Sequence, residues 1–446
     1  MRRRTYLKAT GTALLGLAAT GRAAADGSSD RRGVYRPGGP WPGSEQAFNL
    51  DGFHTNEELA AELRKIDRRS DRITLRRIGE SAGLGEPIWE VTVGDGDTSV
   101  HLINQIHGDE PVGTEVTLDL IRDLALGNSG RVETLLDGLS FTIVPRVNPD
   151  GAMFEYDIDG DGRAEWIGRR YNTQAWEPGD SRYEPYYHYR YPADAPPGYD
   201  MNRDFNVLPP GDLPDPIPEE WWTVEDGEAF LDVPYEGYTL RSSGLRLAPE
   251  VRAVTESALR ADPDYAITHH HQGRYLYPDS GDGNRPPKQT IMSVMPAYGP
   301  VYRERSPFDF PGADVEQVVD PFIDAETSQR SLQLNVLVAN ALAERGDSVF
   351  DSVTRYGYYP LWGSYLDTVC PQTGAAGLLY EVTGQTDDRG QQGLGQMIQA
   401  TKEGFAATFE AMADGSIADV DAEDYWDIPL TGEPLSNPHG VELPTR

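Results

Sequence analysis

The amino-acid sequence predicts a single α/β domain in which helices cover a central β-sheet. Helical and β-rich segments alternate along most of the chain, and no internal repeat or long linker divides it. Thr55 is followed three residues later by Glu58, and this capping-box pattern predicts the start of the first helix. We place the folded domain at residues 48–413, after an extended lead-in at 26–47 and before an acidic C-terminal tail at 414–446.

Hydrophobic periodicity and turn residues give the remaining elements. The expected strands are short and β-rich, and they cover residues 73–78, 88–93, 99–106, 139–144, 265–268 and 377–382. The expected later helices have 3.6-residue apolar spacing and cover residues 113–126, 249–261, 328–345 and 393–412. Residues 157–232 are dense in aromatic, proline and acidic residues, so we expect long loops over a concave face.

Residues 1–25 have the layout of an export signal. Arg3 and Arg4 match the twin-arginine pattern, and a short apolar run and small residues follow them. That run is too short for a membrane anchor, so we expect cleavage near Ala25 and secretion by the twin-arginine pathway. The single cysteine, Cys370, excludes an internal disulfide and a lipid-modified cysteine at the cleavage site. We therefore expect no membrane anchor.

The chain is strongly acidic, with a formal net charge of -33 and lysine at only four positions. Such a surface repels nucleic acid and anionic lipid, which excludes both as partners. Self-repulsion is relieved where salt screens it, so we infer a halophilic source. An acidic face that attracts cationic substrates is the alternative explanation.

Two clusters of candidate metal ligands follow expected strands. His107 and Glu110 are three residues apart, so one tight turn can aim both side chains at one point. The second cluster is His269-His270-His271, in which neighbouring rings point to opposite faces of a strand. One of these histidines would complete the two-histidine, one-carboxylate ligand set of a catalytic zinc.

Five motifs follow one another along the chain: His107 with Glu110, Asn148-Pro149-Asp150-Gly151, Asp200-Met201-Asn202-Arg203, the histidine cluster, and Glu381. Together they resemble the zinc carboxypeptidase family, which is also called the metallocarboxypeptidase or carboxypeptidase A-like family. The resemblance covers about residues 48–412 and implies a mixed eight-stranded sheet flanked by helices. It also implies one Zn²⁺ per chain and hydrolysis of the C-terminal peptide bond of a peptide or protein with a free C-terminus. We thus expect a secreted, haloarchaeal-type member.

The resemblance implies His107, Glu110 and His270 as the zinc ligands. His270 follows Pro263-Asp264 at the spacing common in the family. Counting back from Tyr277-Pro278 selects His269 instead, and this alternative stays open.

The resemblance also assigns roles around the metal. Glu381 is expected to be the general base, and Asn202 with Arg203 the clamp for the terminal carboxylate of the substrate. Arg170 is expected to stabilise the oxyanion, with Arg169 as the alternative. No tyrosine of the segment before Glu381 can be assigned to the site, and nothing in the sequence sets the side-chain preference or the oligomeric state.

Asp157, Asp159 and Asp161 alternate as in the first half of a calcium loop, and they predict a Ca²⁺ site. The twelfth position of the loop is Gly168 and not glutamate, so an ordinary acidic turn is the alternative. Two alternative functions also remain. One is a zinc amidohydrolase acting on a non-peptide or cell-wall amide, and the other is a non-catalytic exported binding protein on the same scaffold.

Overall fold

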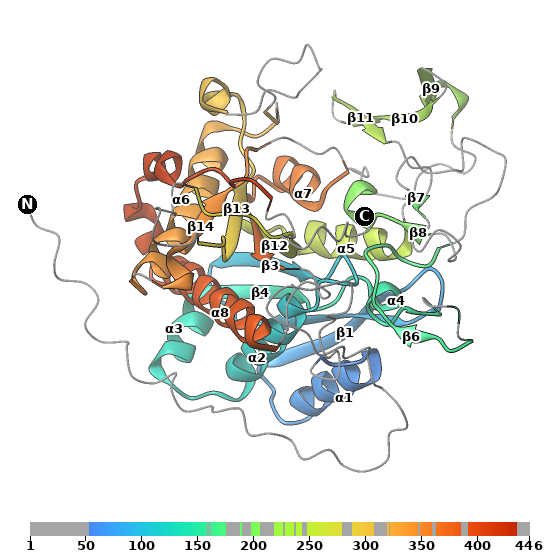
Figure 1. Ribbon diagram of the computed structural model, residues 1–446, viewed down its shortest axis with the longest axis horizontal. Coiled ribbons are helices and arrows are strands. Elements are labelled where there is room, and N and C mark those ends of the chain that lie inside the picture. The colour runs from blue at the N-terminus through green and yellow to red at the C-terminus, as the bar shows by residue number, and fades with distance from the viewer. Residues whose placement is uncertain are drawn as a thin grey trace, which may run out of the picture. The chain divides into compact units, whose positions relative to one another are not determined.

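An eight-stranded mixed sheet forms the centre of the computed structural model (Figure 1). The strand order is β1-β2-β4-β3-β12-β15-β13-β14. These strands are β1 (Ile73–Glu80), β2 (Pro87–Val93), β3 (Thr98–Asn104), β4 (Leu139–Val144), β12 (Tyr265–Gln272), β13 (Met292–Pro296), β14 (Val353–Arg355) and β15 (Ala376–Thr383). Strands β4, β3, β12 and β15 run parallel to one another, whereas the β1–β2, β2–β4 and β13–β15 pairs are antiparallel. The expected mixed eight-stranded sheet is confirmed.

The structure describes residues 53–157, 160, 162–174, 188–189, 198–205, 218–225, 228–235, 238–242, 248–278, 288–306, 319–320, 322–346, 348–358, 363–384 and 391–434. The expected export signal at 1–25 and lead-in at 26–47 lie outside these residues. Among the described helices, none combines the length and the apolar character needed to cross a bilayer.

Helices cover both faces of the sheet. They are α1 (Asn56–Asp67), α2 (Val112–Leu126), α3 (Gly130–Gly138), α4 (Pro149–Ala152), α5 (Pro249–Ala261), α6 (Ala325–Ala343), α7 (Tyr365–Thr373) and α8 (Gln391–Ala413). Figure 1 shows α2, α3 and α8 on one side of the sheet and α5 and α7 on the other. Both faces of β12 are consequently buried along its whole length.

The start of α1 shows how local sequence sets an element. Thr55 Oγ1 accepts a hydrogen bond from the Glu58 amide at 3.2 Å, and Glu58 Oε2 accepts one from the Thr55 amide at 2.9 Å. This is the expected capping box. The helix then buries Leu59, Leu63 and Ile66 on one face, which fixes α1 against the domain.

Strand β12 is longer than expected, because it runs from Tyr265 through Gln272 and includes all three histidines. Histidine has no strong strand preference, but β3 and β15 supply a pairing partner on each side. Tertiary pairing therefore overrides local preference. The expected strand at 139–144 and the expected helix at 249–261 match β4 and α5 at both ends.

Several elements were not expected from the sequence. Helices α3 and α7 and strands β13 and β14 are short, and Pro371 lies inside α7. The expected loop region at 157–232 contains short strands. Those in or beside it are β5 (Glu155–Tyr156), β6 (Glu165–Trp166), β7 (His188–Tyr189), β8 (Gly198–Tyr199), β9 (Trp222–Glu225), β10 (Glu228–Tyr235) and β11 (Tyr238–Ser242).

The segment that was expected to be an acidic tail continues the packed structure. Two 3-10 helices, Ser416–Asp419 and Ala422–Asp427, follow α8. Ile417 and Tyr425 are buried in the hydrophobic core. The packed structure thus extends beyond residue 413.

Candidate metal centre and active site

Three neighbouring parallel strands deliver the candidate site residues to one edge of the sheet. His107 and Glu110 follow the end of β3, His270 lies near the end of β12, and Glu381 lies near the end of β15. Parallel neighbours place their carboxyl ends side by side, so residues distant in sequence converge there.

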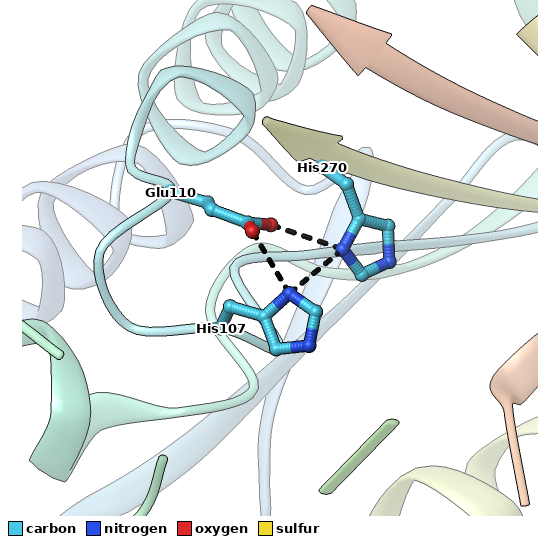
Figure 2. Close-up of side chains that lie close together, drawn as sticks. All are labelled: His107, Glu110 and His270. Carbon is cyan, nitrogen blue, oxygen red and sulfur yellow. Dashed lines mark hydrogen bonds and ion pairs between the residues drawn. The ribbon is translucent and has the colours of Figure 1, made fainter. Parts of the chain in front are cut away.

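His107, Glu110 and His270 form one cluster, and their side chains point toward one another in Figure 2. Glu110 Oε1 lies 2.9 Å from His107 Nδ1, and Glu110 Oε2 lies 2.9 Å from His270 Nδ1. The two Nδ1 atoms are 3.1 Å apart. One ligand atom from each residue falls within 4.8 Å of the others, and all three residues are buried.

This cluster fits a divalent metal ion. Two ring nitrogens and a carboxylate face each other within hydrogen-bonding distance. Two unprotonated imidazole nitrogens repel each other at this distance, so a proton or a cation must lie between them. Two histidines and one carboxylate are a ligand set of catalytic zinc, which keeps a further position open. The residues present therefore suit zinc.

The alternation of β12 separates the three adjacent histidines. His269 points to the other face, where its Nε2 lies 3.0 Å from Thr401 Oγ1 in α8. His271 also faces that side, and its Nε2 accepts a hydrogen bond from the Val112 amide at 3.3 Å. Burial, the largest effect, lowers the pKa of His271 to about 4, which keeps the ring a neutral acceptor at the start of α2. Only His270 of the three lies beside Glu110.

Glu110 is ionised in this environment. Burial alone would raise the pKa of its carboxyl group, but the charges of His107 and His270 and their hydrogen bonds hold that pKa well below its usual range. An anionic ligand between two imidazoles is what a divalent cation requires.

Asp200 links the metal cluster to an arginine. Its Oδ1 lies 3.2 Å from His107 Nε2, and its Oδ2 accepts a hydrogen bond from Arg170 Nε at 2.8 Å. Despite its burial, the charges of Arg170 and His107 hold the pKa of Asp200 well below its usual value. A carboxylate on the outer nitrogen of a ligating histidine fixes the ring and its tautomer. In the sequence, only the position of Asp200 at the start of the Asp200-Met201-Asn202-Arg203 motif draws attention to this residue.

Arg169 and Arg170 occupy different environments. Arg170 is half-buried, and its Nη1 lies 3.8 Å from Glu110 Oε1. Arg169 is buried over the Phe154 ring, with its guanidinium carbon 4.1 Å from the ring centroid. Of the two, Arg170 faces the candidate metal centre.

Asn202 and Arg203 lie in a 3-10 helix, Met201–Arg203, directly after Asp200. Asn202 is buried, and its Oδ1 accepts a hydrogen bond from the Tyr365 amide at 3.0 Å. The Arg203 side chain is partly exposed and near enough to Glu381 for its charge to lower the pKa of that carboxyl group. Asn202 and Arg203 thus lie beside the candidate metal cluster.

Glu381 lies next to the metal cluster, and one of its carboxylate oxygens has no partner among the described residues. It pairs in register with His270 of β12 and with Ser293 of β13. Within the described part of the chain, its Oε2 is buried and has no hydrogen-bond partner. Burial first, and the charge of Glu110 second, raise the pKa of Glu381 to about 8. Perturbed carboxyl groups of this kind are typical of catalytic sites.

One phenol that the sequence did not single out lies near this carboxyl group. Tyr356 donates a hydrogen bond to Gln272 Oε1 at 2.6 Å, and after burial the charge of Glu381 contributes to its raised pKa. Trp362, in the segment before Glu381 where no tyrosine could be assigned to the site, lies outside the described residues.

The expected calcium loop is described only in part. Asp157 Oδ2 accepts a hydrogen bond from the Gly162 amide at 2.8 Å. Asp159 and Asp161 lie outside the described residues, so the Ca²⁺ site stays a prediction.

Known proteins with a similar sequence agree with the observed fold. A family model described as zinc carboxypeptidase matches residues 59–407. Carboxypeptidase E of Caenorhabditis elegans is 29% identical over 168 residues, which cover 35% of this chain and 30% of that protein. Human carboxypeptidase D is 30% identical over 118 residues, which cover 24% of this chain and 8% of that protein. The chain thus spans less than a third of the length of these curated relatives.

Solved structures with a similar trace were also found. Carboxypeptidase A from Helicoverpa armigera is 16% identical with a TM-score of 0.47, covering 80% of this chain and 74% of its own. Bovine thrombin-activatable fibrinolysis inhibitor, in complex with tick carboxypeptidase inhibitor, is 16% identical with a TM-score of 0.48. The match covers 82% of this chain and 98% of that chain.

The sheet, the converging strand ends and the His–Glu–His cluster define an α/β protein with a candidate metal centre at the carboxyl ends of its parallel strands. Because the family model spans most of the sequence, the chain belongs to the zinc carboxypeptidase family, whose members are zinc-dependent peptide hydrolases.

Proposed function

We propose that this protein is an exported zinc-dependent metallocarboxypeptidase that hydrolyses C-terminal peptide bonds. The observation that carries the proposal is the convergence of His107, Glu110 and His270 beside Glu381. His107, Glu110 and His270 would hold one zinc ion, as in the family. The family membership supports the reaction class, and the geometry supports the assignment of residues.

Bound zinc would polarise the scissile carbonyl group and acidify a water molecule. In the proposed reaction, Glu381 accepts a proton from the attacking water and delivers it to the departing amine nitrogen, while the water oxygen enters the new carboxylate. The buried Oε2, which has no hydrogen-bond partner among the described residues, is the acceptor that this step needs. Arg170, held by Asp200, would stabilise the charge that develops on the carbonyl oxygen.

Asn202 and Arg203 would bind the terminal carboxylate of the substrate. A guanidinium group can hold both carboxylate oxygens at once, and Arg203 is partly exposed at the border of the cluster. This position supports an exopeptidase, since a substrate without a free carboxylate would lose the contact.

Paired peptides test the proposal. A free-acid peptide should be cleaved, whereas its C-terminally amidated twin should be cleaved at least about tenfold more slowly. In Arg203→Gln, the KM for the free-acid peptide should rise about 10- to 100-fold with little change for the amidated one. Equal cleavage of both peptides would contradict the clamp. Turnover only of a non-peptide or cell-wall amide would favour the amidohydrolase, and bound zinc without any turnover would favour the binding protein.

We further propose export through the twin-arginine pathway and a salt-adapted surface. The order of charged, apolar and small residues in 1–25 supports the first point, and the net charge of -33 supports the second. The mature N-terminus, measured by mass spectrometry on secreted protein, should follow Ala25. Retention of residues 1–25 in the secreted protein would contradict the signal.

A further inference from the structure

Gln105 has an unusual backbone conformation immediately before the loop that carries two of the proposed zinc ligands. Its φ is 52°, in the left-handed region, and Asp262 is the only other non-glycine residue of the described chain with a positive φ. Gln105 is buried, at 1% exposure. Left-handed backbone at a bulky residue persists only where the surroundings fix it, and such positions cluster at functional sites.

The side chain of Gln105 bridges the loop to two neighbouring elements. Its Nε2 donates a hydrogen bond at 2.8 Å to the carbonyl oxygen of Gly108, which lies between His107 and Glu110. Its Oε1 accepts from Thr114 Oγ1 in α2 at 2.7 Å and from Arg146 Nε at 2.7 Å. Because a guanidinium group can only donate, these contacts orient the amide with its NH₂ group toward the loop.

Arg146 anchors the other end of this bridge. It is buried, and it donates to Asn56 Oδ1 at 2.8 Å and to the His54 carbonyl oxygen at 2.7 Å besides Gln105. Burial lowers the pKa of Arg146 to about 10, so it remains charged at neutral pH. A buried charged donor that hydrogen-bonds to these neutral acceptors holds the Gln105 amide in place.

The loop lies against the backbone of α4 at Gly108. A Cβ atom added at Gly108 would come within 2.1 Å of the Gly151 carbonyl carbon, so the two backbones are in close contact. Figure 2 shows this one short loop carrying His107 and Glu110 to the same point. The side-chain amide of Gln105 therefore hydrogen-bonds directly to the backbone of Gly108, between the two proposed ligands.

We infer that Gln105 is a positioning residue that sets the separation of His107 and Glu110 by holding the Gly108 carbonyl oxygen. The inference rests on the proposed zinc site and adds a residue outside the proposed ligand set. This role explains why glutamine occupies a left-handed position that glycine adopts more easily. The hydrogen bonds of the side chain require glutamine, and they offset the cost of the backbone conformation.

Glycine substitution separates the side chain from the backbone. In Gln105→Gly, the left-handed conformation is relieved and the amide is lost; zinc affinity, measured by chelator competition, should fall about 10- to 100-fold. Asp262→Gly is the matched control, because it makes the same backbone change at the C-terminus of α5. It should leave zinc affinity unchanged. Gln105→Met, which keeps the side-chain volume but cannot donate, should lose zinc affinity like Gln105→Gly.

The thermal midpoint of the metal-free proteins completes the test. Metal-free Gln105→Gly should lose some thermal stability, because Thr114 and Arg146 lose a buried partner, but it should still be folded at the temperature of the binding assay. Weaker zinc binding then cannot be attributed to general unfolding. Zinc affinities of both Gln105 variants within about twofold of the wild type would overturn the inference. Failure of the wild type itself to bind zinc would instead overturn the proposed function, so the two failures are distinguishable.

Discussion

His270 and Glu381 lie directly opposite each other on the parallel strands β12 and β15. Opposed residues of paired strands project to the same face of a sheet, so the proposed ligand and the proposed base are neighbours by backbone register. This places a carboxyl group beside the metal cluster without any contribution from a loop.

Glu381→Gln should abolish most of the activity while the metal stays bound. We expect kcat to fall about 10²- to 10⁴-fold, because the amide cannot accept the water proton. Zinc content should remain one per chain, and stability should not decrease, since burial already disfavours the charged form of Glu381. Kinetics and metal analysis on the same preparation check both points. Activity within about tenfold of the wild type would exclude Glu381 as the base.

Alanine substitutions should separate the adjacent histidines. His270→Ala should lose stoichiometric zinc, because one of three ligands is removed. His269→Ala should keep zinc but lose about 2–4 kcal/mol of stability, since its ring packs against Tyr380 and Phe405. Zinc retained in the first variant and lost in the second would reverse the assignment.

Asp200→Asn should weaken zinc binding about 10- to 100-fold, because the carboxylate that orients His107 and holds Arg170 becomes neutral. Asp204→Asn is the matched control in the same segment. Burial raises the pKa of Asp204 to about 8, so this carboxyl group is already mostly neutral at pH 7, and the variant should bind zinc normally. Equal affinities for both variants would remove the proposed role of Asp200.

His101 should make the folded state sensitive to acid. Its ring is buried between Tyr365 and Ser257, and burial lowers its pKa from 6.5 to about 4. Between these values the unfolded chain binds a proton that the folded chain does not, so stability falls as the pH drops from 6.5 toward 4. The full effect is about 3 kcal/mol.

His101→Gln should lack this contribution to the pH dependence. Denaturant unfolding at pH 7.5 and at pH 4.5 measures the difference in each protein. The wild type should lose more stability than the variant over this interval, and parallel losses would contradict the buried neutral state of His101.

The strand ends that carry the site could be predicted from the sequence, because apolar runs stop immediately before His107 and just after Glu381. The choice of His270 over His269 rested on spacing, and strand alternation alone could not say which face of β12 would carry a metal. In the structure β12 lies between β3 and β15, and His270 lies beside Glu110.

Other features could not be read from local patterns. The bridge from Asp200 to His107 joins residues 93 positions apart, and Arg169 differs from Arg170 only by the surroundings that each meets. The conformation of Gln105 likewise depends on Arg146 and Thr114, which no sequence period connects to it. Tertiary contacts, and not propensity, decide these positions.

X-ray absorption at the zinc edge, with metal quantification on the purified protein, tests the central claim most directly. We expect one zinc per chain with only nitrogen and oxygen neighbours at about 2.0–2.2 Å and the outer-shell signature of two imidazoles. The signature of one imidazole should disappear in His270→Ala, along with most of the zinc. A sulfur neighbour, or an unchanged two-imidazole spectrum in His270→Ala, would contradict a metal centre built from His107, Glu110 and His270.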